Sequence, residues 1–193
     1  IGSNMKTFID ETDGQLDFYN RFLVRVNKNL TLEDILSDNN DGVINGNIIE
    51  FKLNINDINS VLFQAIKYLS AMRVKGKSIP ANIVLISLNT EKAYIFDSQS
   101  YLKEIETIYT SSASKNNIGF TAHTKPIQLD YSSQLHAEDL ITTLKSSNYI
   151  KINNDAFINN TQKNRIATRL ADSIKKNTNG KFVGSLEGTE DSY

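Results

Sequence analysis

Residues 41–52 read Asp-Gly-Val-Ile-Asn-Gly-Asn-Ile-Ile-Glu-Phe-Lys and are the most informative part of the sequence. Its Asn45-Gly46 dipeptide favours a two-residue type I′ turn, because both positions of that turn need positive φ. Apolar β-branched residues stand on either side of the dipeptide, as is typical of paired strands. We therefore expect a tight β-hairpin, with Ile44 opposite Asn47 and Val43 opposite Ile48.

The same register places two carboxylates, Asp41 and Glu50, directly opposite each other. Opposed carboxylates repel, and a divalent cation held between them would remove the repulsion. Lys52 follows Glu50 by two residues, so strand alternation puts both side chains on one face. Two carboxylates and an ammonium on one face suit metal-dependent hydrolysis of a phosphodiester. The spacing also fits an exposed hairpin with ordinary surface charges.

A helix and two strands are expected after the hairpin. Asn56-Asp57 can cap a helix with one apolar face, which Gly76 and Pro80 then end. Residues 83–88 are continuously apolar, as in a strand buried on both faces, and residues 93–96 form a second strand. The order strand, helix, strand predicts a βαβ crossover and an α/β layer fold.

Apolar spacing predicts further elements outside this segment. Residues 16–28 carry an approximate helical stripe, and residues 31–34 have the composition of a helix start. We also expect helices over residues 101–109, 137–145 and 161–176, and a short strand over residues 149–152.

The helix expected after the hairpin contains Gln64 and Tyr68, which lie about one turn apart on the same side. At about 100° per residue, this pair lies beside the apolar stripe and not opposite it. From there both side chains could reach the hairpin carboxylates. A partly buried glutamine and tyrosine that are satisfied within the core would show the same pattern.

Together, Asp41-Gly42, Glu50-Phe51-Lys52 and the segment from Gln64 to Tyr68 resemble the RecB-like branch of the PD-(D/E)xK nucleases. The resemblance covers residues 16–110, and Asn40 stands where the proline that names the family would be. It implies a restriction-endonuclease-like core, in which helices flank a mixed sheet.

The resemblance also implies a role for each matching residue. Asp41 and Glu50 would bind Mg²⁺, for which Mn²⁺ can substitute, and the backbone carbonyl of Phe51 would be a further ligand. Lys52 would act on the attacking water, and the pair on the following helix would help to position the substrate and the lysine. The catalytic residues expected on this basis are Asp41, Glu50, Lys52, Gln64 and Tyr68.

Members of this family often carry a further acid on the helix before the hairpin. Glu33 is the best-placed candidate for this metal ligand, and Asp34 and Asp38 are its rivals.

The sequence around these motifs also resembles the amino-terminal nuclease segment of large bacterial restriction-modification polypeptides. In those proteins a helical connector, an adenine-specific methyltransferase and a target-recognition domain follow. We therefore expect a Mg²⁺-dependent endonuclease domain for double-stranded DNA over residues 5–125. Residues 126–193 would form a mainly helical connector or a winged-helix-like element that leads to such domains. A dimer would allow both strands to be cut.

Composition narrows the chemistry further. The 193 residues, 39% hydrophobic and 22% charged, are typical of a globular protein of the cytoplasm with no membrane span. With no cysteine and two histidines, any metal would have to be held by oxygen ligands. The net charge is −1, but cations gather near the C-terminus. The candidates there for DNA contact are Lys163, Arg165, Arg169 and Lys175, although a solvated helix face fits equally well.

Three other functions stay open on the sequence alone. The chain could be a catalytically silent nuclease fold that serves DNA binding or assembly. It could instead be a RecB-like exonuclease or single-strand nuclease. Finally, it could be a structural α/β domain in which the motif match is accidental.

Overall fold

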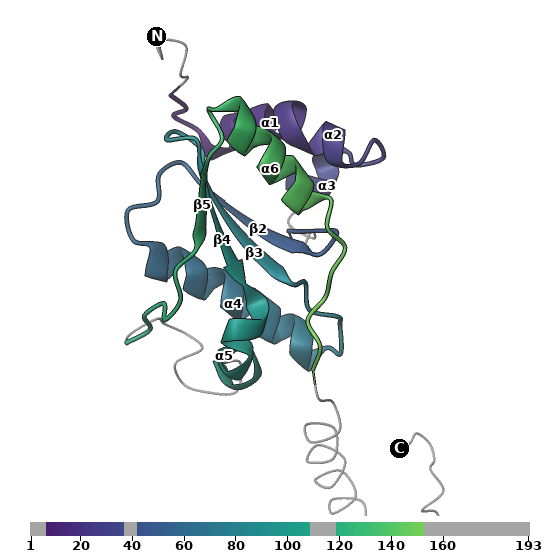
Figure 1. Ribbon diagram of the computed structural model, residues 1–193, viewed down its shortest axis with the longest axis vertical. Coiled ribbons are helices and arrows are strands. Elements are labelled where there is room, and N and C mark those ends of the chain that lie inside the picture. Colours follow the sequence, from purple (N-terminus) through teal and green to yellow (C-terminus); the bar gives the residue numbers. More distant parts are fainter. Residues whose placement is uncertain (1–6, 37–41, 109–118, 153–193) are drawn as a thin grey trace, which may run out of the picture. The chain divides into compact units, whose positions relative to one another are not determined.

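The computed structural model describes residues 7–36, 42–108 and 119–152. The chain divides into two compact units, Ile1–Ile150 and Lys151–Tyr193, and every element below belongs to the first. A five-stranded mixed sheet has helices on both faces (Figure 1). The strands are β1 (Val43–Ile44), β2 (Asn47–Lys52), β3 (Asn82–Ser87), β4 (Lys92–Asp97) and β5 (Ile127–Asp130). The helices are α1 (Glu11–Phe18), the π-helical turn η1 (Tyr19–Leu23), α2 (Val24–Val26), α3 (Leu32–Leu36), α4 (Ile58–Val74), the 3₁₀ turn η2 (Ser98–Tyr101), α5 (Leu102–Thr107) and α6 (Gln134–Leu144).

The predicted hairpin is present as strands β1 and β2. Val43 opposes Ile48 and Ile44 opposes Asn47, so the predicted register is confirmed. The predicted turn type is wrong, because only Asn45 has positive φ, at 54°. Positive φ at the first turn position alone is the pattern of a type II′ turn.

Glycine at position 46 is required for space. A Cβ there would lie 2.2 Å from the backbone oxygen of Asn148 and 2.6 Å from its nitrogen. The Gly46 N–H donates to the Ser146 carbonyl at 2.7 Å, and the Ala81 N–H donates to the Asn148 carbonyl at 3.0 Å. The segment after α6 therefore closes directly onto the hairpin turn.

The predicted βαβ crossover is also confirmed, since β2 and β3 are parallel and α4 connects them. The Asp57 side chain caps α4 by accepting a hydrogen bond from the Asn59 N–H at 3.1 Å. At the other end Gly76 has φ 75°, and its N–H donates to the Arg73 carbonyl. The Lys77 N–H donates to the Met72 carbonyl, which completes a Schellman motif.

The other strand pairs, β3 with β4 and β4 with β5, are antiparallel. Strand β5 is absent from the predicted elements, although it extends the sheet. The boundary predicted after residue 125 falls inside the first unit, which also includes α6. The strand predicted over residues 149–152 is wrong: Tyr149 makes a single isolated bridge with Pro80.

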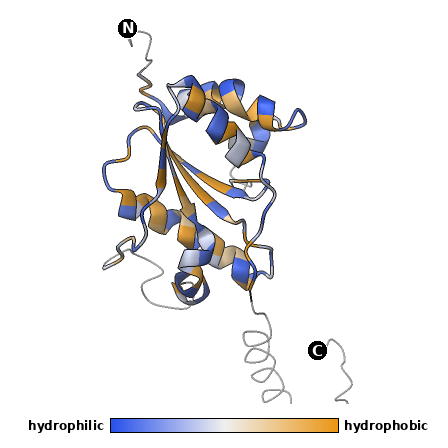
Figure 2. Cartoon of the chain, viewed as in Figure 1, coloured by the Kyte–Doolittle hydropathy of each residue, from blue (hydrophilic) through white to orange (hydrophobic). Residues whose placement is uncertain are grey.

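Helices cover the two faces of the sheet separately (Figure 1). Helices α1 and α6 share one hydrophobic cluster with alternate residues of β2, β3, β4 and β5. Helix α4 packs on β2 and β3 from the other face and contacts α5. Figure 2 shows the strands coloured largely as hydrophobic, whereas hydrophobic and hydrophilic residues alternate along the helices. Because helices cover both faces of the sheet, the side chains of β3 are buried on both sides, in agreement with its continuous apolar sequence.

The helical region expected over residues 16–28 begins earlier and is irregular. Asp10 caps α1 by accepting from the Thr12 N–H at 2.9 Å, so the helix begins at Glu11. The π-helical turn η1 inserts an extra residue per turn, which changes the spacing of the apolar positions. Phe22 is consequently buried, whereas Leu16 is 39% exposed.

None of the helices in the described part of the chain is long and apolar enough to span a membrane.

We predict that Gly46→Ala lowers the free energy of unfolding by about 3 kcal/mol, because the added methyl meets backbone that cannot rotate away. Urea denaturation would measure this as a lower midpoint at an unchanged slope.

Gly76→Ala is the matched control. Nothing lies within 4 Å of the Cβ that it would add, and only the positive φ opposes it. We expect a cost of about 1 kcal/mol. Equal costs at the two positions would contradict a steric requirement at position 46.

Candidate functional site

Glu50 and Lys52 lie on the face of the sheet that α4 covers. Ile49 is part of the cluster on the opposite face, and the Phe51 ring lies 5.3 Å from that of Phe18 in α1. Side chains alternate along a strand, so Glu50 and Lys52 point the other way. The predicted sharing of one face by these two residues is confirmed.

The pair lies at the carboxyl end of two parallel strands. Glu50 is in register with Leu85 of β3, and Lys52 is in register with Ser87. Ligands of open α/β sheets bind beyond the carboxyl ends of the strands. Glu50 and Lys52 therefore lie at the end of the sheet where ligands of such folds bind.

Glu50 is half-buried, and its surroundings favour the neutral acid. Burial raises the pKa of Glu50 above its ordinary value, the neighbouring charge of Lys52 lowers it, and the charge of Glu11 raises it again. Burial is the largest of these effects because a carboxylate loses solvation when it leaves water. A cation bound beside Glu50 would restore the charged form.

Glu11 is an acid that the sequence patterns did not single out. It is half-buried in the first turn of α1, close enough to Glu50 for its charge to affect the pKa there. The predicted extra ligand, Glu33, is instead exposed on α3. Its rival Asp34 accepts a hydrogen bond from the Thr31 N–H at 2.8 Å and caps α3, while Asp38 lies outside the described residues.

Gly42 marks the hairpin edge beside the pair. Its carbonyl accepts the Ile49 N–H at 2.9 Å, its φ is 71°, and an added Cβ would lie 3.0 Å from the Ile49 oxygen. The backbone N–H and C=O groups of residues two apart in a strand point to the same side, so the Phe51 carbonyl points toward the edge that the Ile49 N–H faces. Asp41, bonded to Gly42, lies outside the described residues. Within the described ranges, no three acidic or histidine side chains gather to hold a metal.

The pair on α4 is placed differently from the prediction. Leu62 and Ile66 are fully buried, and Gln64 lies two residues from each, nearly opposite the buried stripe. Gln64 is accordingly exposed, so its predicted position beside the stripe is wrong. Tyr68 is half-buried, as predicted for a residue at the boundary. The basic candidates Lys163, Arg165, Arg169 and Lys175 lie outside the described residues.

Comparison with protein-family models, with curated proteins and with solved structures finds no match to this chain. A functional assignment therefore depends on the residues and geometry described above.

We predict that Glu50→Gln stabilises the metal-free protein increasingly as the pH rises above about 4.5. The native pKa of Glu50 is raised, so in the wild type the free energy of unfolding falls between the unfolded and native pKa values. The glutamine variant lacks this loss. Urea denaturation in EDTA between pH 4 and pH 8 would measure the difference.

Glu33→Gln serves as the control, because the exposed Glu33 carboxylate keeps its solvation when the protein folds. If the Glu50 and Glu33 variants followed the same pH dependence, the cost of burying the Glu50 carboxylate would be refuted.

Proposed function

We propose that this chain is a Mg²⁺-dependent DNA endonuclease domain of the PD-(D/E)xK type with a restriction-endonuclease-like core. The observation that carries the proposal is the half-buried Glu50 beside Lys52 at the carboxyl end of parallel strands. Burying a carboxylate lowers the stability of the fold, and such buried acids are found most often at functional sites, where a bound cation would stabilise the charge. The motif order noted in the sequence supports the same class.

The donor chemistry at this edge fits a hard cation. Glu50 and the Phe51 carbonyl supply oxygens. The Gly42 carbonyl is hydrogen-bonded to Ile49 of β2, and Asp41 directly precedes Gly42 in the sequence. We assign Asp41 and Glu50 as the metal ligands, with the Phe51 carbonyl as a third. Glu11, whose charge raises the pKa of Glu50, joins Glu33 as a candidate for the further acid. A bound Mg²⁺ would polarise the phosphate and lower the pKa of a coordinated water.

Lys52 would supply the remaining chemistry. Its ammonium shares a face with the Glu50 carboxylate, at the end of the strand where substrate would approach. There it would orient the attacking water and stabilise charge that develops on the phosphate oxygens. Tyr68, at the boundary of α4, is the member of the pair that would help to position the lysine, whereas Gln64 is exposed nearly opposite the buried stripe of that helix.

The proposed substrate is double-stranded DNA. The resemblance to restriction-modification polypeptides supports a longer protein in which methyltransferase and target-recognition domains follow, with a dimer as one way to cut both strands. The cations at Lys163, Arg165, Arg169 and Lys175 would contribute phosphate contacts.

We predict that the protein nicks closed circular DNA in Mg²⁺ or Mn²⁺, and that Lys52→Ala lowers the rate by at least about 100-fold. Lys75→Ala, which removes an exposed lysine at the end of α4, should leave the rate unchanged. Gel analysis of single-turnover reactions would measure both rates.

The choice of substrate separates the proposal from its rivals. Cleavage of linear or single-stranded DNA, but not of closed circles, would identify an exonuclease. A folded protein that binds DNA but cuts none of the three with any divalent metal would instead be a silent binding module.

A further inference from the structure

Lys92 lies on the same face of the sheet as Glu50 and Lys52. Ser87 of β3 is in register with Lys52 on one side and with Lys92 of β4 on the other. Residues in register on neighbouring strands project to the same face, so the three form one row across the sheet. With strands about 4.8 Å apart, the Cα atoms of the two lysines are about 10 Å apart.

The middle of this row is closed to ligands. Ser87 is buried, and its Oγ accepts hydrogen bonds from the Ile55 N–H at 3.2 Å and from the Thr90 hydroxyl at 2.7 Å. The two lysines on either side are only half-buried. The row therefore offers two cations at the carboxyl end of β2 and β3, separated by a covered hydroxyl.

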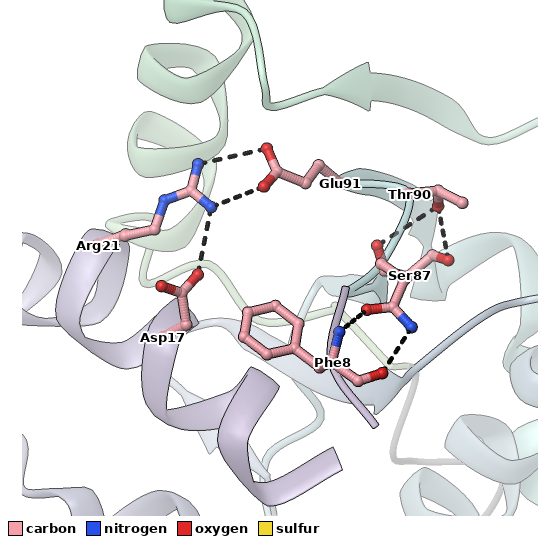
Figure 3. A network of polar contacts seen from close by, with 7 residues as sticks. Phe8, Asp17, Arg21, Ser87, Thr90 and Glu91 are labelled. Carbon is pink, nitrogen blue, oxygen red and sulfur yellow. Dashed lines mark hydrogen bonds and ion pairs between the residues drawn. The ribbon is translucent and has the colours of Figure 1, made fainter. Parts of the chain in front are cut away.

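The turn before Lys92 is held in an unfavourable conformation. Glu91 has φ 52°, which a residue with a side chain rarely adopts, and it is 8% exposed. Arg21 binds both of its carboxylate oxygens, at 3.0 and 3.4 Å, and also contacts Asp17 (Figure 3). This network fixes the turn where β4 begins, and hence the register that brings Lys92 into the row. Backbone strain of this kind is often found near functional sites.

A competing charge is Asp130, which is in register with Lys92 on β5. The Asp130 carboxylate accepts a hydrogen bond from Gln128 Nε2 at 3.2 Å. Among the described residues, no ion pair includes Lys92. Its ammonium is thus available to a phosphate.

We propose that Lys92 is a second phosphate-binding residue of this site and contacts the DNA backbone next to the phosphate that is hydrolysed. The inference rests on the proposed function, because it takes the scissile phosphate to lie beside Glu50 and Lys52. In this arrangement the sheet itself would help to set the direction of the DNA strand across the site. Lys92 would act on binding, not on the attacking water.

The test compares wild type, Lys92→Gln and Lys75→Gln as full chains. Binding of a duplex is measured in Ca²⁺ over a range of salt concentrations, and nicking is measured in Mg²⁺. Lys92→Gln should weaken binding about tenfold and reduce the slope of log affinity against log salt by about 1, as for one lost phosphate contact. KM should rise while kcat changes little, and Lys92→Arg should restore KM. Lys75→Gln should match wild type.

An unchanged salt slope together with a lower denaturation midpoint in Lys92→Gln would overturn the inference, and would make Lys92 a cross-strand partner of Asp130 only. In that case wild type would still cut DNA and the proposed function would stand. If instead wild type neither bound nor cut DNA, and Glu50→Gln changed no response to metal, both the proposed function and the role of Lys92 would fail.

Discussion

The register of strand β2 is the constraint on which the site depends, because a slip by one residue would exchange the two faces of the strand. Asn47 holds this register from within the core. Its buried amide donates to the Ile44 carbonyl at 3.1 Å and to the Leu144 carbonyl at 3.3 Å, and its Oδ1 accepts from Asn82 Nδ2 at 3.0 Å. A displaced strand would leave these polar groups unpaired in the core, at a cost of about 1–3 kcal/mol each.

The hairpin turn, the βαβ crossover and the segment that follows α6 all adjoin strand β2. The turn at Gly46 packs against Asn148, and β3 runs parallel to β2 beside it. These contacts keep Ile49 and Phe51 in the apolar layer beneath α1. Glu50 is thereby held half-buried on the other face, where its charge is poorly solvated. The packing that stabilises the fold thus keeps the Glu50 carboxyl where its negative charge is poorly solvated, and a bound cation would stabilise that charge.

Much of this architecture could be predicted from local patterns. The hairpin register followed from Asn45-Gly46 and its apolar neighbours, the start of α4 from Asp57, and the buried strand β3 from its continuous apolar run. Each of these signals acts within a few residues of the element that it specifies.

The rest depended on contacts between distant segments. Strand β5 is short, and Ile127 at its start is 63% exposed, so its sequence lacks a buried strand's pattern. Glu11 reaches the neighbourhood of Glu50 only because α1 packs beside β2, which no spacing in the sequence encodes. Gln64 was misplaced because the buried face of α4 is wider than its most apolar residues suggested, and this leaves the glutamine outside it.

Calorimetric titration of Mn²⁺ into wild type and into an Asp41→Ala, Glu50→Ala double variant would measure whether these two carboxylates bind metal. We expect binding by wild type that disappears in the double variant, while both proteins remain folded. Equal binding by the two proteins, or none by either, would show that the hairpin carboxylates do not form a metal site.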